Sequence, residues 1–497
     1  MESAFFPNKV KQSFNYLIPL IFGGIGVLAF APFSLKFLII PSYSYLICSL
    51  LLDAKDSYKR TLVMWTIGHW GIGVSWIIVS VYYYGNIGYI ASSIVYMLFL
   101  ILILLFAVAP IRLFKIKKEY PLNLHSALYI SSVFILLELS RDFYFGGFPW
   151  LVPGTVGIDT ILSIAFPLIG VAGVSFVIYL LSAVIAMSWN NNRKISYVFL
   201  TLSFLILIPS NPHTEEAGET TLKISLVQPS LDPQLKFNRG YKTEIEGALL
   251  TLTNKIQNES DLIIWPEVEL PYSYNSKQFK ELKNKINPST ELITGIWLFE
   301  ENKLYNSLIS IKSDEIYKKR HLVPFGEYIP FKSILNPLLN YFGAPISDIS
   351  PGTSNQEPIS INNDIKAAPL ICYDIVFAND VRKAVKSSDF IINISNDSWF
   401  GGSLGPYQHL EIARIRAIEN NRWIARSTND GFTAFINNKG TIVSLMPKYQ
   451  QGSLTNEISL IKSSTIYSEY GYYVTYLFSI IYIFITLSLY LWSKLRN

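Results

Sequence analysis

Long apolar runs dominate this sequence and limit the folds that are open to it. They lie at about residues 14–31, 36–52, 62–83, 87–110, 126–140, 160–187, 195–209 and 472–492. Several exceed the roughly 20 residues that a helix needs to cross the hydrocarbon core of a bilayer. Half of the residues are hydrophobic and only 15% are charged, which excludes an ordinary soluble protein. We expect a polytopic α-helical membrane domain of about eight spans. Seven or nine stay open as alternatives, because some runs are short or interrupted.

Basic residues in the short loops indicate the orientation of these spans. With eight spans and a cytoplasmic N-terminus, thirteen Lys and Arg residues fall in inside segments, and only Lys36 and Arg141 fall in outside loops. Short cytoplasmic loops carry the excess of basic residues, so the long segment 212–470 is expected outside the cytoplasm. The sequence thus predicts spans 1 to 7 in residues 1–211, an inserted extracytoplasmic domain in 212–470, and a final span with a cytoplasmic tail in 471–497.

The outer segment is close to neutral and carries one of the two cysteines. It holds 26 Lys and Arg against 29 Asp and Glu, a net charge of about −3, so the overall charge of +5 comes from the cytoplasmic loops. This balance gives no support for nucleic-acid binding. Cys48 lies in an apolar run and Cys372 in the outer segment, so the two are not expected to pair. A lone thiol in an oxidising compartment is a liability unless it has a function.

Strand-like and helical patterns alternate along the outer segment. Strand-like runs lie at 222–229, 261–265, 291–297, 304–311, 365–373, 390–395, 422–427 and 432–436, and helical periods at 240–257, 276–286, 377–387 and 406–420. This alternation predicts a layered α/β domain with its functional residues at strand ends. Residues 324–352, rich in aromatic residues and proline, are expected to form a long loop.

Three reactive side chains stand at or near the ends of strand-like runs in this domain. Glu267 follows Leu-Ile-Ile-Trp-Pro, Cys372 follows Ala-Pro-Leu-Ile, and Lys319 lies between them in the chain. A carboxylate, an amine and a thiol brought together would supply a base, a cationic oxyanion stabiliser and a nucleophile, which thiol-based acyl chemistry requires.

Each of these residues also has an ordinary structural interpretation. Cys372 could be a small buried hydrophobic residue, and Glu267 a surface carboxylate. Lys319 could be a solvated member of the charged run 318–320, and only the Tyr-x-Lys-x-His-Leu spacing selects it over Lys318.

Two other kinds of site fit the sequence less well. Gly401-Gly-Ser403-Leu-Gly405 matches the G-x-S-x-G pattern of serine hydrolases and His409 lies nearby, but that pattern needs a sharp strand-to-helix turn at the serine. The strand is expected to end near Ser395. The five histidines show no pair at metal-ligand spacing, so neither a metal nor another cofactor is expected.

Glu138 and Arg141 are the ionisable residues of note in the apolar part. They stand three apart near the end of the fifth run and could pair on one helix face. Ionisable groups at membrane depth are functional candidates, but a pair near the interface equally fits structural anchoring.

The order Glu, Lys, Cys resembles the nitrilase superfamily, and the whole chain resembles its membrane-embedded branch, the apolipoprotein N-acyltransferase family. The motifs that carry this resemblance are Gly71-Ile-Gly-Val-Ser-Trp76, Gly146-Gly-Phe-Pro-Trp-Leu151, Val227-Gln-Pro229, Trp265-Pro-Glu267, His321-Leu-Val-Pro-Phe-Gly-Glu327, Cys372-Tyr373, Asn396-Asp-Ser-Trp-Phe-Gly401 and Gln408-His409 with Arg414 and Arg416. It implies an αββα nitrilase-like sandwich for the outer domain, inserted before the last span.

The resemblance also implies roles for individual residues. Glu267, Lys319 and Cys372 would form the catalytic set, and Glu327 would orient Lys319 or give further acid-base help. Tyr373 and Asp374 would support the nucleophile. Tyr373 would also form part of the pocket wall around the acyl chain, together with Phe237, Trp399 and Phe400. The family often has tryptophan in place of Phe237 and glutamate in place of Asp374, so the chemical type is kept while fine positioning differs.

The activity implied is lipoprotein maturation at the bacterial inner membrane. A fatty acyl chain would pass from a phospholipid to the Cys372 thiol, and then to the α-amino group of a diacylglyceryl-cysteine at the N-terminus of an apolipoprotein. Two alternatives stay open: a membrane-anchored nitrilase-type amidase that passes the acyl group to water, and a non-catalytic transporter or sensor.

Overall fold

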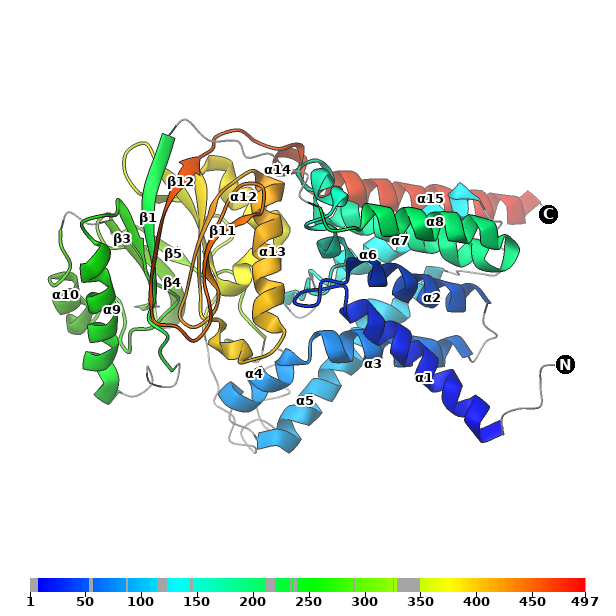
Figure 1. Ribbon diagram of the computed structural model, residues 1–497, viewed down its shortest axis with the longest axis horizontal. Helices are drawn as coiled ribbons and strands as arrows, with labels where there is room; N and C mark the ends of the chain where they lie inside the picture. Colours follow the sequence, from blue (N-terminus) through cyan, green and yellow to red (C-terminus); the bar gives the residue numbers. More distant parts are fainter. Residues whose placement is uncertain are drawn as a thin grey trace. The chain divides into compact units, whose positions relative to one another are not determined.

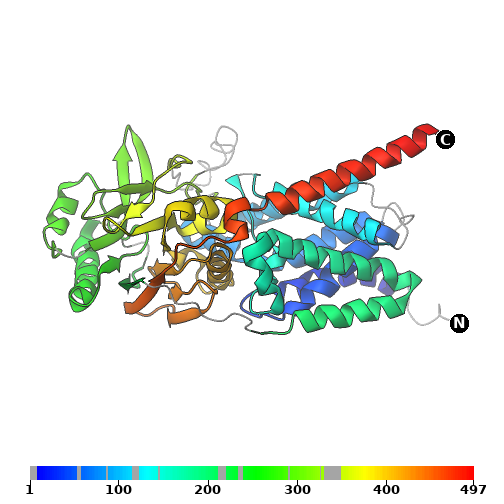
Figure 2. The ribbon, with the colours of Figure 1, turned by 90° about the horizontal axis from the view of Figure 1, so that it is seen from above.

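The computed structural model describes residues 8–52, 57–85, 88–114, 123–143, 146–210, 220–232, 235, 239–288, 291–324, 326–328 and 349–496. The chain divides into two compact units. The first comprises Met1–Ile78, Ser93–Pro212 and Tyr470–Asn497, and the second comprises Val79–Ser92 and His213–Glu469. Figures 1 and 2 show the elements of both units in two views.

Helices form at all eight of the apolar runs. They are α1 (Asn8–Val27), α2 (Ile39–Leu52), α3 (Ser57–Gly73), α4 (Trp76–Gly85), α5 (Gly88–Ile103), α6 (Leu124–Ser140), α7 (Phe166–Asn191), α8 (Arg193–Ile206) and α15 (Tyr473–Arg496). The run 62–83 is divided between α3 and α4, which are bent by 60° at Val74–Ser75. The helix axis therefore changes direction within this run, which the apolar pattern alone does not reveal.

Two helical segments among the described residues are long and apolar enough to cross a membrane, Gly88–Ile111 and Ile161–Trp189. The bent pair α3 and α4 adds a third if it counts as one span. Four shorter apolar helices lie at Phe14–Val27, Lys36–Leu51, Leu124–Ser140 and Tyr473–Leu489. Length and composition therefore support a helical membrane part, while the count of eight stays a prediction.

Close backbone approach and one buried polar cluster hold parts of the first unit together. A Cβ atom on Gly68 of α3 would come within 2.2 Å of the Leu20 carbonyl oxygen on α1, so only glycine fits there. On α6, Arg141 lies 3.7 Å from the Glu138 carboxylate, which confirms the expected pair. Arg141 also donates to the Trp150 carbonyl at 2.8 Å, so the pair fixes the aromatic loop that follows α6.

The second unit contains two six-stranded sheets with the orders β12-β1-β2-β3-β4-β5 and β11-β10-β9-β8-β7-β6. The first sheet is built from β1 (Thr220–Gln228), β2 (Leu262–Ile264), β3 (Glu291–Glu300), β4 (Lys303–Ser310), β5 (Ile316–Lys318) and β12 (Gly452–Leu460). The second is built from β6 (Ile359–Ser360), β7 (Lys366–Ile371), β8 (Phe390–Ser395), β9 (Ile424–Thr428), β10 (Thr433–Ile436) and β11 (Ile442–Met446).

Four helices of this unit complete an α-β-β-α sandwich. They are α9 (Lys242–Ile256), α10 (Lys277–Lys283), α12 (Ala378–Ala384) and α13 (Gly405–Asn420). The short α14 (Ile466–Tyr470) follows β12, and most of α4 also falls in this unit. Strand alternation explains the layering. Leu262 and Ile264 of β2 point into the apolar core between the sheets, whereas Ile263 points into the core under α9 and α10. The expected nitrilase-like sandwich is confirmed.

Ile264 gives a direct test of this core. It is fully buried between the sheets, so Ile264→Ala should leave a cavity and cost about 2 to 5 kcal/mol. Thermal unfolding of the full-length protein in detergent should show a clearly lower midpoint. The matched change Val443→Ala removes a 41% exposed side chain from β11 and should leave the midpoint almost unchanged. Equal midpoints for both variants would contradict this packing.

Candidate active site

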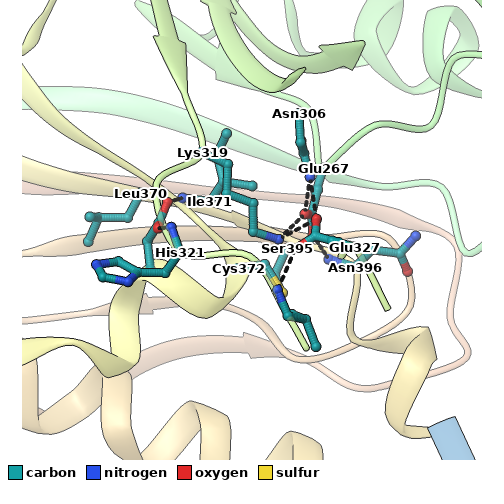
Figure 3. A network of polar contacts seen from close by, with 12 residues as sticks. Glu267, Asn306, Lys319, His321, Glu327, Leu370, Ile371, Cys372, Ser395 and Asn396 are labelled. Carbon is teal, nitrogen blue, oxygen red and sulfur yellow. Dashed lines mark hydrogen bonds and ion pairs between the residues drawn. The ribbon is translucent and has the colours of Figure 1, made fainter. Parts of the chain in front are cut away.

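The three sequence-predicted catalytic residues converge at strand ends of the second unit. Glu267 follows β2, Lys319 follows β5, and Cys372 follows β7 of the facing sheet. Figure 3 shows these three side chains and that of Glu327 pointing toward one another. All four are almost completely buried, which places the site inside the sandwich rather than on its surface.

Lys319 is shared by two carboxylates. Its ammonium nitrogen lies 2.9 Å from Glu267 Oε1 and 2.9 Å from Glu327 Oε1, and the lysine side chain is 2% exposed. The neighbouring Lys318 points elsewhere, pairing with Glu300 and lying 4.5 Å from the Tyr305 ring centre. The solvated-charge interpretation therefore describes Lys318 and does not describe Lys319.

Asn306 of β4 completes this arrangement, and sequence reasoning missed it. Its Nδ2 donates to Glu267 Oε1 at 2.7 Å and to Glu327 Oε1 at 3.1 Å. Its carbonyl oxygen accepts from the Lys319 backbone N–H at 2.8 Å. Asn306 thus contacts the lysine backbone through its own backbone carbonyl and both carboxylates through its side-chain amide. Nothing in the surrounding Tyr-Asn-Ser-Leu run distinguishes it from any other asparagine on a strand.

Backbone amides hold the outer oxygen of each carboxylate. Glu267 Oε2 accepts from the Asn396 N–H at 2.9 Å, just after β8. Glu327 Oε2 accepts from the Val323 N–H at 2.9 Å within its own loop. Each carboxylate is therefore fixed at both oxygens.

The Cys372 thiol stands on a sharp turn directly after β7. Cys372 has φ of +48°, a region that residues other than glycine seldom occupy. Asp374 braces the turn: its Oδ2 accepts from the Ile371 N–H and the Tyr317 hydroxyl, both at 3.1 Å, and its Oδ1 accepts from the His321 N–H at 2.9 Å. The strand-like run expected to reach Tyr373 thus ends at Ile371, because the chain turns to display the thiol.

Burial and charge decide which of these groups is ionised. Burial raises the pKa of the Cys372 thiol, the Glu267 carboxylate raises it further, and Lys319 only partly opposes them. Burial alone would lower the pKa of Lys319, but Glu267 and Glu327 raise it well above its ordinary value. The resting site therefore holds a neutral thiol beside an ammonium and a carboxylate that can accept the thiol proton.

A second buried ion pair is connected to Cys372 through His409. Arg426 of β9 donates to Asp397 Oδ2 at 2.7 Å, and both side chains are fully buried. His409 of α13 lies 3.1 Å from Asp397 Oδ1 and 3.2 Å from the Cys372 carbonyl oxygen. The available signal was an arginine inside the strand-like run 422–427, which also begins with Arg422, but this signal does not identify the partners of Arg426.

Three of the remaining predicted residues, Tyr373, Trp399 and Phe400, lie among the described residues. Tyr373 is buried and meets the Phe377 ring edge-on at 5.2 Å. Phe400 is buried with its ring 5.9 Å from that of His409, and half-buried Trp399 precedes it in the same short helix. Phe237 lies outside the described residues.

Ser403, the serine-hydrolase candidate, occupies the turn before α13. Its hydroxyl donates to the Phe400 carbonyl at 2.6 Å and accepts from the Gly405 N–H at 3.3 Å. β8 ends at Ser395, so Ser403 does not follow the strand as a nucleophile elbow requires. The hydroxyl is thus used in hydrogen bonds within this turn.

The sandwich that brings Glu267, Lys319 and Cys372 together is that of the carbon-nitrogen hydrolase class. The family model for Carbon-nitrogen hydrolase matches residues 223–465, and that for Apolipoprotein N-acyltransferase N-terminal domain matches residues 22–184. The apolipoprotein N-acyltransferase of Pasteurella multocida is 32% identical over 93% of this chain and 92% of its own length. That of Coxiella burnetii is 32% identical over 95% of this chain and 99% of its own length. The chain belongs to the apolipoprotein N-acyltransferase family and is an acyltransferase.

Among solved structures, a CN-hydrolase superfamily protein of Xanthomonas campestris matches 48% of this chain and 91% of its own length. The sequence identity is 21% and the TM-score is 0.37.

The neighbouring lysines provide a matched test of the site. Lys319→Met should lower the rate of Cys372 acylation by about 10²-fold or more, because it removes a charge placed to stabilise the oxyanion. Lys318→Met should stay within about twofold, because it breaks only a partly exposed ion pair. Single-turnover acylation of both variants measures this, and equal losses would contradict the assignment of Lys319.

Proposed function

We propose that the protein transfers a fatty acyl chain from a membrane phospholipid, through a thioester on Cys372, to the α-amino group of the N-terminal diacylglyceryl-cysteine of apolipoproteins. The observation that carries the proposal is the buried contact of Lys319 with both Glu267 and Glu327 beside the Cys372 thiol. The names of the full-length relatives support this substrate class.

In the first step the Cys372 sulfur attacks the ester carbonyl of the phospholipid while Glu267 takes the thiol proton. Lys319 stabilises the negative charge that develops on the carbonyl oxygen. The carbon–sulfur bond forms, the ester carbon–oxygen bond breaks, and Glu267 returns the proton to the leaving oxygen. A lysophospholipid departs and the acyl chain stays on the enzyme as a thioester.

In the second step the α-amino nitrogen of the lipoprotein attacks the thioester carbonyl. The amide bond forms, the carbon–sulfur bond breaks, and Glu267 carries the amine proton to the departing sulfur. Glu327 orients Lys319 through both steps, and Asp374 keeps the nucleophile turn in place. Tyr373, Trp399 and Phe400 serve as walls for the acyl chain.

Membrane placement is part of the proposal, because both substrates are too apolar to leave the bilayer. We infer eight spans in the bacterial inner membrane, with spans 1 to 7 in residues 1–211, the catalytic domain in 212–470 on the periplasmic side, and the last span in 471–497. The thirteen-to-two bias of basic residues supports this orientation, as do the apolar helices.

The orientation can be tested with topology reporters. Fusions in the loop at 84–86 and after Asn497 should give opposite signals, periplasmic for the first and cytoplasmic for the second. Like signals at the two positions would overturn the span count.

The transfer chemistry can be tested by the mass of the intact protein. Incubation with phospholipid alone should add one acyl chain to Cys372, because water is poorly placed to attack a thioester in an apolar pocket. A diacylglyceryl peptide should then discharge the adduct, with ping-pong kinetics. Cys372→Ala should form no adduct, and Ser403→Ala should behave as the wild type.

Other outcomes identify the alternatives. Rapid release of free fatty acid without the peptide would favour a membrane-anchored hydrolase. No adduct and no fatty acid release with any lipid would favour a non-catalytic transporter or sensor.

A further inference from the structure

Three buried ionisable groups outside the proposed catalytic set form a chain that ends at the nucleophile. Arg426 contacts Asp397, Asp397 contacts His409, and His409 contacts the carbonyl oxygen of Cys372. None of these three side chains is more than 1% exposed. Burying them has a cost unless each is paired, and the mechanism above uses none of them.

The contact with Cys372 falls on a backbone group whose position fixes the thiol. Cys372 occupies the left-handed region with φ of +48°, where a side chain is held only by its surroundings. The Asp374 carboxylate accepts from the backbone N–H of Ile371, the residue before the cysteine. His409 contacts the carbonyl that follows, so the turn is held on both sides of the thiol.

The neighbours of His409 select one tautomer. A carbonyl oxygen only accepts, so its contact with Nε2 requires Nε2 to carry a hydrogen. Nδ1 lies 3.1 Å from both the Arg426 guanidinium, which only donates, and Asp397 Oδ1, which only accepts, so in a neutral ring with its hydrogen on Nε2 it accepts from Arg426. Burial and the Arg426 charge lower the pKa of His409, in agreement with a neutral ring. Asp397 Oδ1 is satisfied by the Ser395 hydroxyl at 2.7 Å.

The same segment also supports the base. Ser395 and Asp397 flank Asn396, whose backbone N–H donates to Glu267. Asp397, which pairs with Arg426, is therefore next in sequence to the residue that contacts Glu267. Through His409 it is also connected to Cys372. The same segment thus supports both groups that exchange a proton in the proposed mechanism.

We propose that His409 is a positioning residue for the nucleophile: its Nε2–H holds the Cys372 carbonyl so that the thiol faces Glu267 and Lys319, and Arg426 with Asp397 fixes its tautomer and orientation. This inference rests on the proposed acyl transfer, because Cys372 acts as the nucleophile in it. A displacement of about 1 Å at a reacting atom can cost about 10²-fold in rate.

Glutamine and asparagine separate the two nitrogens of the ring. His409→Gln keeps a side-chain N–H the same number of bonds from Cα as Nε2, and His409→Asn keeps one in the place of Nδ1. Single-turnover acylation of the full-length protein by phospholipid should stay within about tenfold of the wild type for His409→Gln and fall about 10²-fold for His409→Asn. The KM for phospholipid should not change in either variant. Asn420→Ala, a buried change on the same helix, should retain the wild-type rate.

The reverse order, with His409→Asn active and His409→Gln inactive, would show that His409 serves the Asp397 pair and would overturn the proposal. Wild-type rates in both variants, or equal losses with equally lowered thermal midpoints, would overturn it too. Iodoacetamide labelling of the Cys372 peptide, read by mass without any lipid, should follow the same order. If the wild type is labelled but never acylated, the proposed function fails, and the labelling order still decides the role of His409.

Discussion

The site depends on one buried ammonium shared by two carboxylates. Removing three charges from water is costly, and their mutual attraction offsets that cost only when the geometry is good and the remaining hydrogen-bonding positions are filled. Lys319 lies at 2.9 Å from both glutamates. Asn306 bridges the same two oxygens, and the backbone amides of Asn396 and Val323 hold the other two. The surroundings therefore hold two carboxylates close together around one ammonium.

This arrangement explains why the fold needs two sheets. The base and the lysine follow strands of the first sheet, and the thiol follows a strand of the second. The apolar core between the sheets fixes their separation, because interiors pack densely and resist local displacement. Burial there also keeps the Cys372 thiol neutral. In the proposed mechanism, activation of the thiol then depends on transfer of its proton to Glu267 rather than on a resting thiolate.

The positions of Glu267 and Cys372 at strand ends could be predicted because both residues follow apolar runs, and a side chain after a buried strand is held rigidly. The eight expected strands were all found, but β5, β6, β11 and β12 were missed. The first two have three and two residues, too short for a periodic pattern. β11 and β12 are only partly buried, so their residues are less strongly apolar. Whether such a segment forms a strand depends on its pairing with neighbouring strands, and the residue pattern of a single run does not show this pairing.

Polar contacts between residues far apart in the chain also could not be predicted from the sequence. Asn306 meets Glu267 across 39 positions and His409 meets Cys372 across 37, so neither partner follows from local spacing. The sequence did indicate Lys319 through its motif, although only the structure separates it from Lys318 by burial. The bend between α3 and α4 was missed for a similar reason, since an apolar run continues through it.

The proposed mechanism requires that Cys372 rest as a neutral thiol and that Glu267 act as the base. The most direct test is the ultraviolet absorbance of thiolate, measured against pH as the difference between the wild type and Cys372→Ser. A free cysteine ionises near pH 8.5, with an unperturbed carboxylate about four units lower. The account predicts no thiolate signal from Cys372 from about pH 6 to 9, because burial and Glu267 raise the pKa of its thiol. A thiolate signal at neutral pH would contradict it and would assign Glu267 a different role.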